Sequence, residues 1–244
     1  MSTSVLLACE LNEQKLPPFV LIQENSGADA SFLVASLIGN CLKYQQNGVV
    51  LVCLHHISQH YTSAAARLGF NISVARDKGR CVIAEPLTDI GQNFLTSTFL
   101  SEPKAELLES LLLSIKADAE QQLNDKGNVT IIIDSISTLV DLGCSKESVL
   151  QFCHRLINLA NDRISIVLKI NTSNLYEDFV SSLEDYANSD YLITKMKSGE
   201  FHEVDGKIIY KKRSDFRHIS KTILYKVGDK NIKIFQPGEI GVRA

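Results

Sequence analysis

Asp134 is the residue whose type and position most invite a chemical interpretation. It follows residues 129–133, an uncharged and largely β-branched run that is typical of a strand buried on both faces of a parallel sheet. An Asp at the carboxyl end of such a strand lies where open α/β sheets bind ligands, and a carboxylate there can hold the Mg²⁺ of a nucleotide. The residues allow a second interpretation, in which Asp134 only caps the segment that follows.

The first strand-to-helix turn, residues 24–31, lacks the sequence that a nucleotide site needs. A phosphate-binding loop reads G-x-x-x-x-G-K-[ST], because its backbone N–H groups cradle phosphates and its Lys reaches the β- and γ-phosphates. In the matching register, Glu24 and Asp29 stand at the two glycines, where a carboxylate at Asp29 would repel a phosphate. We therefore predict a vestigial nucleotide site without a cofactor, made of Asp29, Ala30 at the Lys position, Ser31 at the Ser/Thr position, and Asp134.

Three histidines follow the second predicted strand. His56 and His60 are four residues apart, so they share one face of a helix, and His55 precedes them. Such a pair can bind a metal ion, but no glutamate completes an H-E-x-x-H pattern. We expect a solvated or interface face of this helix and no metal.

The C-terminal part of the chain is more basic than the rest. Between Lys195 and Lys233 there are eleven Lys or Arg residues against five acids. Basic residues beside Tyr210, Phe216 and Tyr225 suit contact with phosphates and stacking on bases. Lysines also protect exposed strand edges, so a solvated edge is the alternative. The candidate RNA-contact residues are Lys211, Lys212, Arg213, Arg217 and Lys221.

Composition favours a soluble intracellular protein. The net charge is −3, no apolar run approaches the roughly 20 residues that span a bilayer, and no charged and apolar leader begins the chain. Six scattered cysteines without a C-x-x-C pair indicate reduced core thiols. The absence of G-x-S-x-G, G-x-G-x-x-G and paired-carboxylate motifs gives no support to independent hydrolase or dehydrogenase chemistry.

Strands and helices alternate along most of the 244 residues, which predicts one α/β domain spanning residues 1–244. Asp29 is the expected N-cap of the first long helix, and residues 86–103 are expected to be irregular. Predicted strands cover residues 19–22, 49–54, 81–84, 129–133, 164–170 and 191–195, and predicted helices cover residues 31–44, 58–68, 105–123, 146–161 and 175–187. Residues 207–212, 222–227 and 231–235 predict antiparallel strands. The fold class is therefore a mostly parallel sheet flanked by helices, with a C-terminal antiparallel extension.

Several stretches together resemble the RecA-like superfamily, and more closely the family of Elongator complex protein six. They include Asp29-Ala30-Ser31-Phe32-Leu33-Val34 in place of a phosphate loop, Ser58-Gln59-His60-Tyr61 followed by Leu68-Gly69, Ala75-Arg76-Asp77-Lys78-Gly79-Arg80, and Ile131-Ile132-Ile133-Asp134-Ser135. The match is dense over residues 19–85, resumes at 129–142 and is weak after 190. No single motif is diagnostic, but their order and spacing are.

This resemblance implies a pseudo-ATPase, that is, a RecA-like subunit without working Walker motifs and without enzyme activity. Two related subunits, Elongator proteins four and five, would join it in a hetero-hexameric ring that binds tRNA. The ring would assist the catalytic Elongator subunits in modifying the wobble uridine of tRNA, in the cytoplasm and also in the nucleus. The candidate subunit interface implied for this chain is His55, His56, His60 and Tyr61.

Two rival functions remain open at this point. One is an atypical RecA-like ATPase that uses Ser31 and Asp134 for Mg²⁺. RecA-like ATPases carry a glutamate after the second strand, and this chain has His55-His56-Ile57-Ser58 there. The missing glutamate counts against an ATPase. The other is a recombinase-paralogue adaptor in DNA repair, although such proteins usually keep a recognisable phosphate loop.

Overall fold

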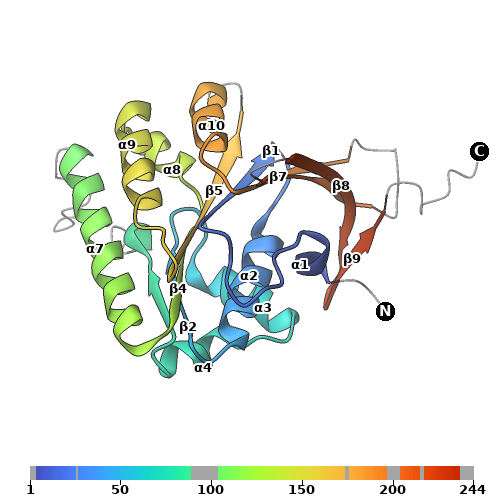
Figure 1. Cartoon of the computed structure of the whole chain (residues 1–244), viewed down its shortest axis with the longest axis horizontal. Coiled ribbons are helices and arrows are strands. Elements are labelled where there is room, and N and C mark those ends of the chain that lie inside the picture. Colours follow the sequence, from blue (N-terminus) through green and yellow to red (C-terminus); the bar gives the residue numbers. More distant parts are fainter. Residues whose placement is uncertain are drawn as a thin grey trace, which may run out of the picture.

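Six strands with apolar sequences pair in parallel at the centre of the molecule (Figure 1). They are β1 Phe19–Asn25, β2 Asn47–Val52, β3 Cys81–Ala84, β4 Asn128–Ile133, β5 Ile164–Thr172 and β6 Ser189–Lys195. Three antiparallel strands continue the sheet beyond β6, namely β7 Gly206–Ser214, β8 Arg217–Val227 and β9 Ile232–Phe235. The order across the sheet is β3-β2-β4-β5-β1-β6-β7-β8-β9. This arrangement confirms the predicted α/β class and its antiparallel extension.

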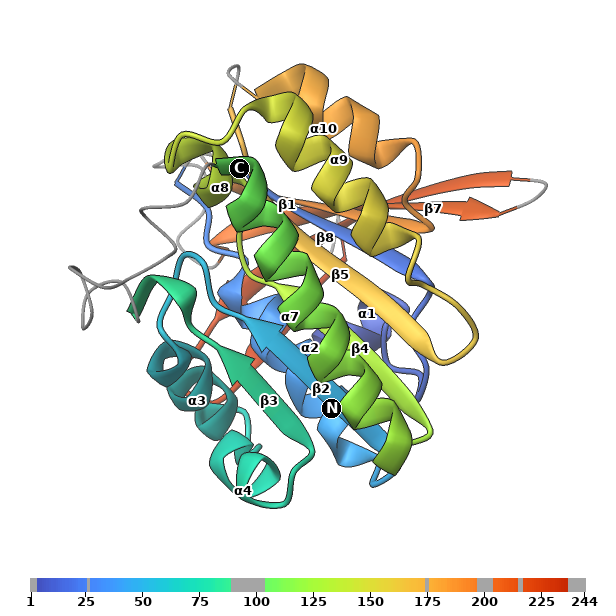
Figure 2. The same cartoon turned by 90° about the vertical axis from the view of Figure 1, so that its left-hand side faces the viewer.

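Helices cover both faces of the sheet (Figure 2). One face carries α1 Val5–Ala8, α2 Ser31–Lys43, α3 Ser58–Arg67 and α4 Ile72–Asp77. The other carries α7 Lys104–Asp125, α8 Ser137–Asp141, α9 Lys146–Ile157 and α10 Glu177–Glu184. Alternate residues of each central strand enter opposite cores; Ile22 of β1 packs on the α2 side and Leu21 packs on the α7 side. The central strands are mostly apolar because both of their faces are buried.

The computed structural model describes residues 4–25, 27–88, 104–173, 176–196, 204–214 and 217–236. Most of the segment expected to be irregular, residues 86–103, lies outside these ranges, as do Ser26 and Phe216, whereas residues 86–88 are helical. Within the described ranges, no helix is both long and apolar enough to cross a membrane. All six cysteines are buried and none forms a disulfide, which confirms them as core thiols.

Element boundaries differ from the sequence expectation at informative places. β1 continues three residues past Ile22 because Gln23 and Glu24 pair with both β5 and β6. The expected N-cap is wrong, since Ala30 occupies that position and Asp29 precedes it. The short helices α4 and α8 were not expected, because six and five residues are too few for a clear period.

β7 and β8 form a long hairpin that projects from the body of the molecule (Figure 2). It begins at Gly206, which pairs with Lys195 of β6 and Tyr225 of β8. A Cβ at position 206 would lie 2.3 Å from the backbone oxygen of Thr194 and 2.6 Å from the hydroxyl of Tyr225. Only glycine therefore allows the close approach that joins the hairpin to the parallel sheet.

Replacing Gly206 with Ala is expected to lower the free energy of unfolding by about 2–3 kcal/mol, since backbone on β6 cannot move away without breaking the ladder. Gly127→Ala is the matched control, because its added Cβ would meet no atom closer than 3.6 Å, and we expect a change within about 0.5 kcal/mol. Urea unfolding followed by circular dichroism compares the two. Equal stabilities would contradict the close-approach argument.

Candidate functional site

The turn between β1 and α2, where a phosphate loop would lie, is filled by the protein's own charges. Oε2 of Glu24 accepts a hydrogen bond from the backbone N–H of Ala30 at 3.0 Å. The same oxygen pairs with Nζ of Lys169, on the neighbouring strand β5, at 2.9 Å. The side chains of Lys169 and Glu24 are only 1% and 7% exposed. A carboxylate thus takes the hydrogen bond that a phosphate would accept at the start of a helix.

Asp29 adds a second internal carboxylate at this helix start. Its Oδ1 accepts the backbone N–H of Ser31 at 2.8 Å. Burial acts to raise the pKa of Asp29, but the contact with Ser31 and the nearby charges of Lys169 and His56 together outweigh it, and the pKa lies below its usual value. Ala30 and Ser31 are both buried. The backbone amides of Ala30, the N-cap, and Ser31, the first residue of α2, are therefore already bonded to carboxylates at the position that the sequence assigned to a vestigial site.

Asp134 is fully buried, and its carboxylate binds the loop that follows β2. Oδ1 accepts the backbone N–H groups of Leu54 at 2.6 Å and His55 at 3.0 Å. Oδ2 accepts the N–H of His56 at 2.9 Å and the hydroxyl of Tyr61 at 3.3 Å. The idea that Asp134 caps its own following segment is wrong, because α8 begins without a side-chain cap. Both oxygens instead hold the β2–α3 loop, and a Mg²⁺ ion would have to displace these donors.

The histidines on this loop and on α3 form a stacked cluster. The rings of His56 and His60 lie 4.1 Å apart and nearly parallel, and His55 meets His56 edge-on at 4.4 Å. Burial, followed by the neighbouring histidines, lowers the pKa of His56. The cluster and Ile57 together line a surface hollow, and Ile57 is 59% exposed. In the described part of the chain, no group of three His, Cys, Asp or Glu residues has metal-binding geometry.

Tyr61 departs from the interface prediction. Its side chain is 0% exposed, and its hydroxyl points to Asp134. The tyrosine therefore belongs to the core below the histidines rather than to a surface. Because it supports Asp134, it still helps to fix the loop that presents the histidines.

The basic residues of the β7–β8 hairpin do not form one patch, because alternate residues of a strand face opposite sides. Lys211 lies 3.5 Å from Glu184 and 3.6 Å from Asp190. Arg213, two residues further along β7, donates to the backbone oxygen of Asp185. Lys212 and Lys221 instead pair with Glu10, on the α1 side. The side chain of Arg217 lies outside the described residues.

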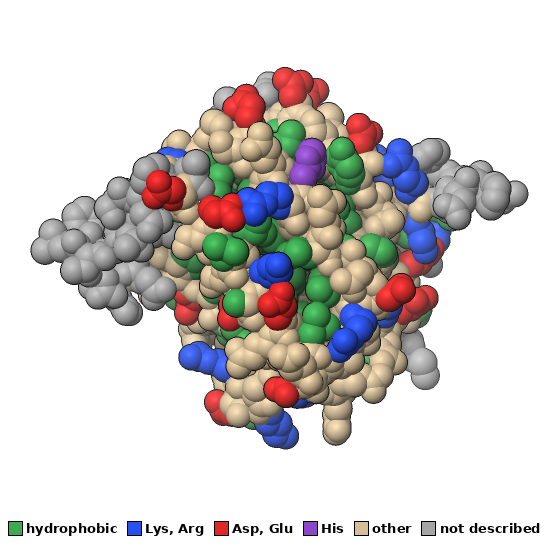
Figure 3. All heavy atoms as spheres, turned by 60° about the vertical axis from the view of Figure 1, so that its left-hand side comes forward, with side chains coloured by type: hydrophobic (Ala, Val, Ile, Leu, Met, Phe, Trp, Pro, Cys, Tyr) green, Lys and Arg blue, Asp and Glu red, His purple; other side chains and the backbone are tan. Residues whose placement is uncertain are grey.

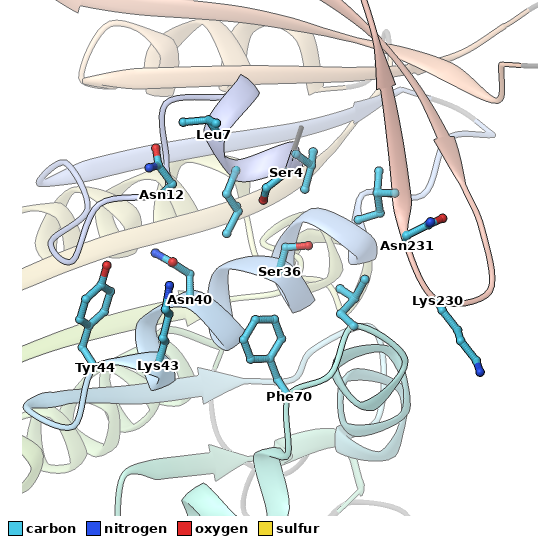
Figure 4. A pocket seen from close by; sticks show the side chains of 14 residues that line it. Ser4, Leu7, Asn12, Ser36, Asn40, Lys43, Tyr44, Phe70, Lys230 and Asn231 are labelled. Carbon is cyan, nitrogen blue, oxygen red and sulfur yellow. The ribbon is translucent and has the colours of Figure 1, made fainter. Parts of the chain in front are cut away.

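Two other surfaces hold none of the predicted residues. A hollow of about 570 Å³ lies between α1, α2 and the β8–β9 turn (Figure 4), and Leu7, Asn40, Phe70 and Lys230 line it. The face that carries α7 and α9 shows acidic and basic side chains interspersed with apolar ones (Figure 3). Neither surface presents a concentration of one charge.

Sequence reasoning missed Lys169 and the acids that pair with the hairpin. Lys169 stands inside an apolar strand, and a charge in such a run signals a buried partner. Glu10 comes from the distant N-terminal part of the chain, so no local pattern indicates it. Asp190 lies directly opposite Lys211 in the β6–β7 pair, and finding it requires the strand register.

A family model and individual relatives point to the same protein family. A family model described as Elongation complex protein 6 matches residues 3–229. Elongator complex protein 6 of Drosophila melanogaster is 39% identical, over 100% of both chains. The human protein of the same name is 25% identical, over 86% of this chain and 87% of its own.

A solved structure shares the fold. The crystal structure of a KaiC-like protein from the archaeon Pyrococcus horikoshii superposes with a TM-score of 0.62, at 16% sequence identity, over 89% of this chain and 88% of its own. This likeness confirms the predicted RecA-like α/β fold.

Lys169→Met should lower the free energy of unfolding by about 3–5 kcal/mol, because it leaves the Glu24 carboxylate buried without its cation. The double variant Glu24→Gln/Lys169→Met should recover much of that loss, since the amide can still accept the Ala30 N–H. Chemical unfolding of the three variants, including Glu24→Gln alone, gives the coupling energy. A double variant no more stable than Lys169→Met would disprove the pairing.

Asp190 gives a prediction about pH. Burial raises the pKa of Asp190 to about 6 from its usual 3.8, against the hydrogen bond from Gln23, and the nearby charge of Glu184 adds to the rise. The protonated acid thus stabilises the fold below pH 4, and this contribution is lost as the pH rises through 6. The free energy of unfolding of Asp190→Asn, relative to that of the wild type, should increase by on the order of 2–3 kcal/mol between pH 4 and pH 7. Asp162→Asn, at a fully exposed acid, is the control, and a parallel pH profile for both variants would refute the assignment.

Proposed function

The chain belongs to the Elongation complex protein 6 family, and from that membership we propose that it is a non-catalytic subunit of a hetero-hexameric RecA-like ring in the Elongator complex. Elongator proteins four and five would be its neighbours in the ring. The ring would bind tRNA and support the catalytic subunits in modifying the wobble uridine, in the cytoplasm and the nucleus.

The observation that carries the non-catalytic role is the self-filled β1–α2 turn. Glu24 and Asp29 accept the α2 amides, and Lys169 neutralises Glu24. A nucleotide phosphate would meet two carboxylates there and would find no lysine at Ala30. Because Asp134 is committed to the β2–α3 loop, the rival ATPase would lack both a phosphate cradle and a free Mg²⁺ ligand.

The histidine cluster supports the proposed docking of a neighbouring subunit. His55, His56 and Ile57 project from a loop that Asp134 fixes at three backbone amides, and His60 follows on α3. A preformed surface loses little conformational entropy on association. Exposed Ile57 and the stacked rings provide apolar and aromatic area, which is enriched in the centres of protein interfaces.

The hairpin supports the proposed tRNA contact. Its lysines are between one-third and one-half exposed, and exposed ion pairs contribute roughly 0–1 kcal/mol each. Such weak pairs leave the lysines able to exchange a carboxylate for a phosphate. Lys211, Lys212, Arg213, Arg217 and Lys221 remain the proposed contact residues.

Co-expression with Elongator proteins four and five tests the assembly. We expect native mass spectrometry to show a hetero-hexamer that binds tRNA, and calorimetry to show no Mg-ATP binding by the isolated chain. Ile57→Asp should prevent assembly, because it places a charge in the proposed contact. Leu113→Asp on α7 is the matched control, at 56% exposure against 59%, and should assemble normally.

Different results would contradict the non-catalytic role and the position of the interface. An isolated chain that binds Mg-ATP would favour the ATPase instead. A hexamer that tolerates Ile57→Asp would move the interface away from the histidine cluster without disproving the ring.

A further inference from the structure

Three hydrogen-bond donors converge on the carboxylate of Glu10. Oε2 accepts from the hydroxyl of Tyr210 and from Nζ of Lys212, each at 3.1 Å, and Oε1 accepts from Nζ of Lys221. The bond from Lys221, followed by those from Lys212 and Tyr210, lowers the pKa of Glu10 to about 2 against the effect of burial. Two ammonium groups and a hydroxyl around one anion are the contacts that a nucleic-acid phosphate also accepts.

The backbone of Glu10 is held in an unfavourable conformation. Its φ of 56° is the one positive value at a non-glycine residue in the described ranges. An L-residue with a side chain pays roughly 1–2 kcal/mol for the left-handed conformation. Strained backbone conformations of this kind persist only where surrounding contacts hold them in place, and they cluster at functional positions.

The contacts of Glu10 are not needed to seat the N-terminal segment. Val5, Leu6 and Cys9 are buried in the core, and the hydroxyl of Tyr191 donates to the backbone oxygen of Cys9 at 2.6 Å. This segment is therefore anchored immediately before Glu10. The acidic side chain adds charge compensation for the hairpin rather than attachment.

From this geometry we infer that Lys212 and Lys221 form a binding site for an RNA backbone phosphate, which Glu10 occupies until RNA displaces it, while Tyr210, which is 0% exposed, stays in the core beneath the site. This inference rests on the proposed tRNA binding and adds a regulation to it. Glu10 is an internal competitor, so it weakens non-specific binding of RNA to the hairpin. Displacement needs only a side-chain rotation, because the Glu10 side chain is 34% exposed and the two lysines are 38% and 49% exposed.

The opposite face of the hairpin has a different character. There Lys211 pairs with Asp190, whose side chain is only 6% exposed and also accepts the amide of Gln23. On that face one ammonium group lies near two carboxylates, whereas on the Glu10 face two ammonium groups share one carboxylate. A phosphate is therefore favoured on the Glu10 face, to which this site is assigned.

The test is the affinity of a fluorescent tRNA transcript for the reconstituted complex, measured over a range of salt concentrations. Glu10→Gln should bind the tRNA about 3–10-fold more tightly, with a salt dependence steeper by roughly one to two released ions, because two lysines become available. Adding Lys212→Gln and Lys221→Gln to this variant should abolish the gain. The control is Glu109→Gln, which changes the net charge equally but breaks an ion pair with Arg155 on another face.

The outcomes separate the two levels of the proposal. Wild-type complex that binds tRNA while Glu10→Gln gains no more than Glu109→Gln would overturn the competitor and leave the tRNA function standing. Failure of wild type and every variant to bind tRNA would overturn both. Thermal unfolding confirms that each variant is folded, and if Glu10→Gln is not, Glu10→Asn replaces it, since Asn adopts positive φ more readily.

Discussion

The ion pair between Glu24 and Lys169 is the interaction on which the interpretation of this molecule depends. The start of α2 carries partial positive charge and unpaired amides, and it is stable only with an anion or an acceptor nearby. In a nucleotide-binding protein, the ligand supplies that anion. Here a carboxylate from the end of β1 supplies it permanently, and a lysine from β5 balances the charge within the fold. The start of α2 is thus satisfied by charges within the fold.

The same principle operates one strand away. Asp134 satisfies the amides of a loop that would otherwise carry unpaired donors next to the core. Both carboxylates occupy positions where a functional nucleotide site would have catalytic or ligand-binding groups, and both now stabilise backbone. The consequence is a well-ordered loop at the carboxyl edge of the sheet, where we propose that a neighbouring subunit docks.

The sequence was sufficient for the architecture, because continuous apolar runs indicate buried parallel strands and their order indicates the alternation with helices. It was insufficient where a contact joins distant residues. The partnership of Glu24 and Lys169 spans 145 positions, and Glu10 lies more than 200 positions before Lys212. The basic composition of the hairpin was visible, but composition does not show that strand geometry sends Lys211 and Lys212 to opposite faces. Tyr61 was placed at the surface with its histidine neighbours, although the helix turns it into the core.

The ability of the hairpin to bind an anion therefore depends on how its own acids compete for the lysines, and not on the net charge alone. The chain has a net charge of −3, yet its lysines could still bind a polyanion if their internal partners exchange readily. The balance of lysines and acids differs between the two faces. Lys211 lies near two acids, Glu184 and Asp190, whereas Lys212 and Lys221 share the one carboxylate of Glu10, which is partly exposed and can return to water when a stronger anion arrives. A nucleic acid carries many phosphates and releases counterions when it binds, an advantage that a single tethered carboxylate cannot match. The two faces of one hairpin thus differ in how readily they would take up a phosphate, according to the balance of lysines and acids on each face.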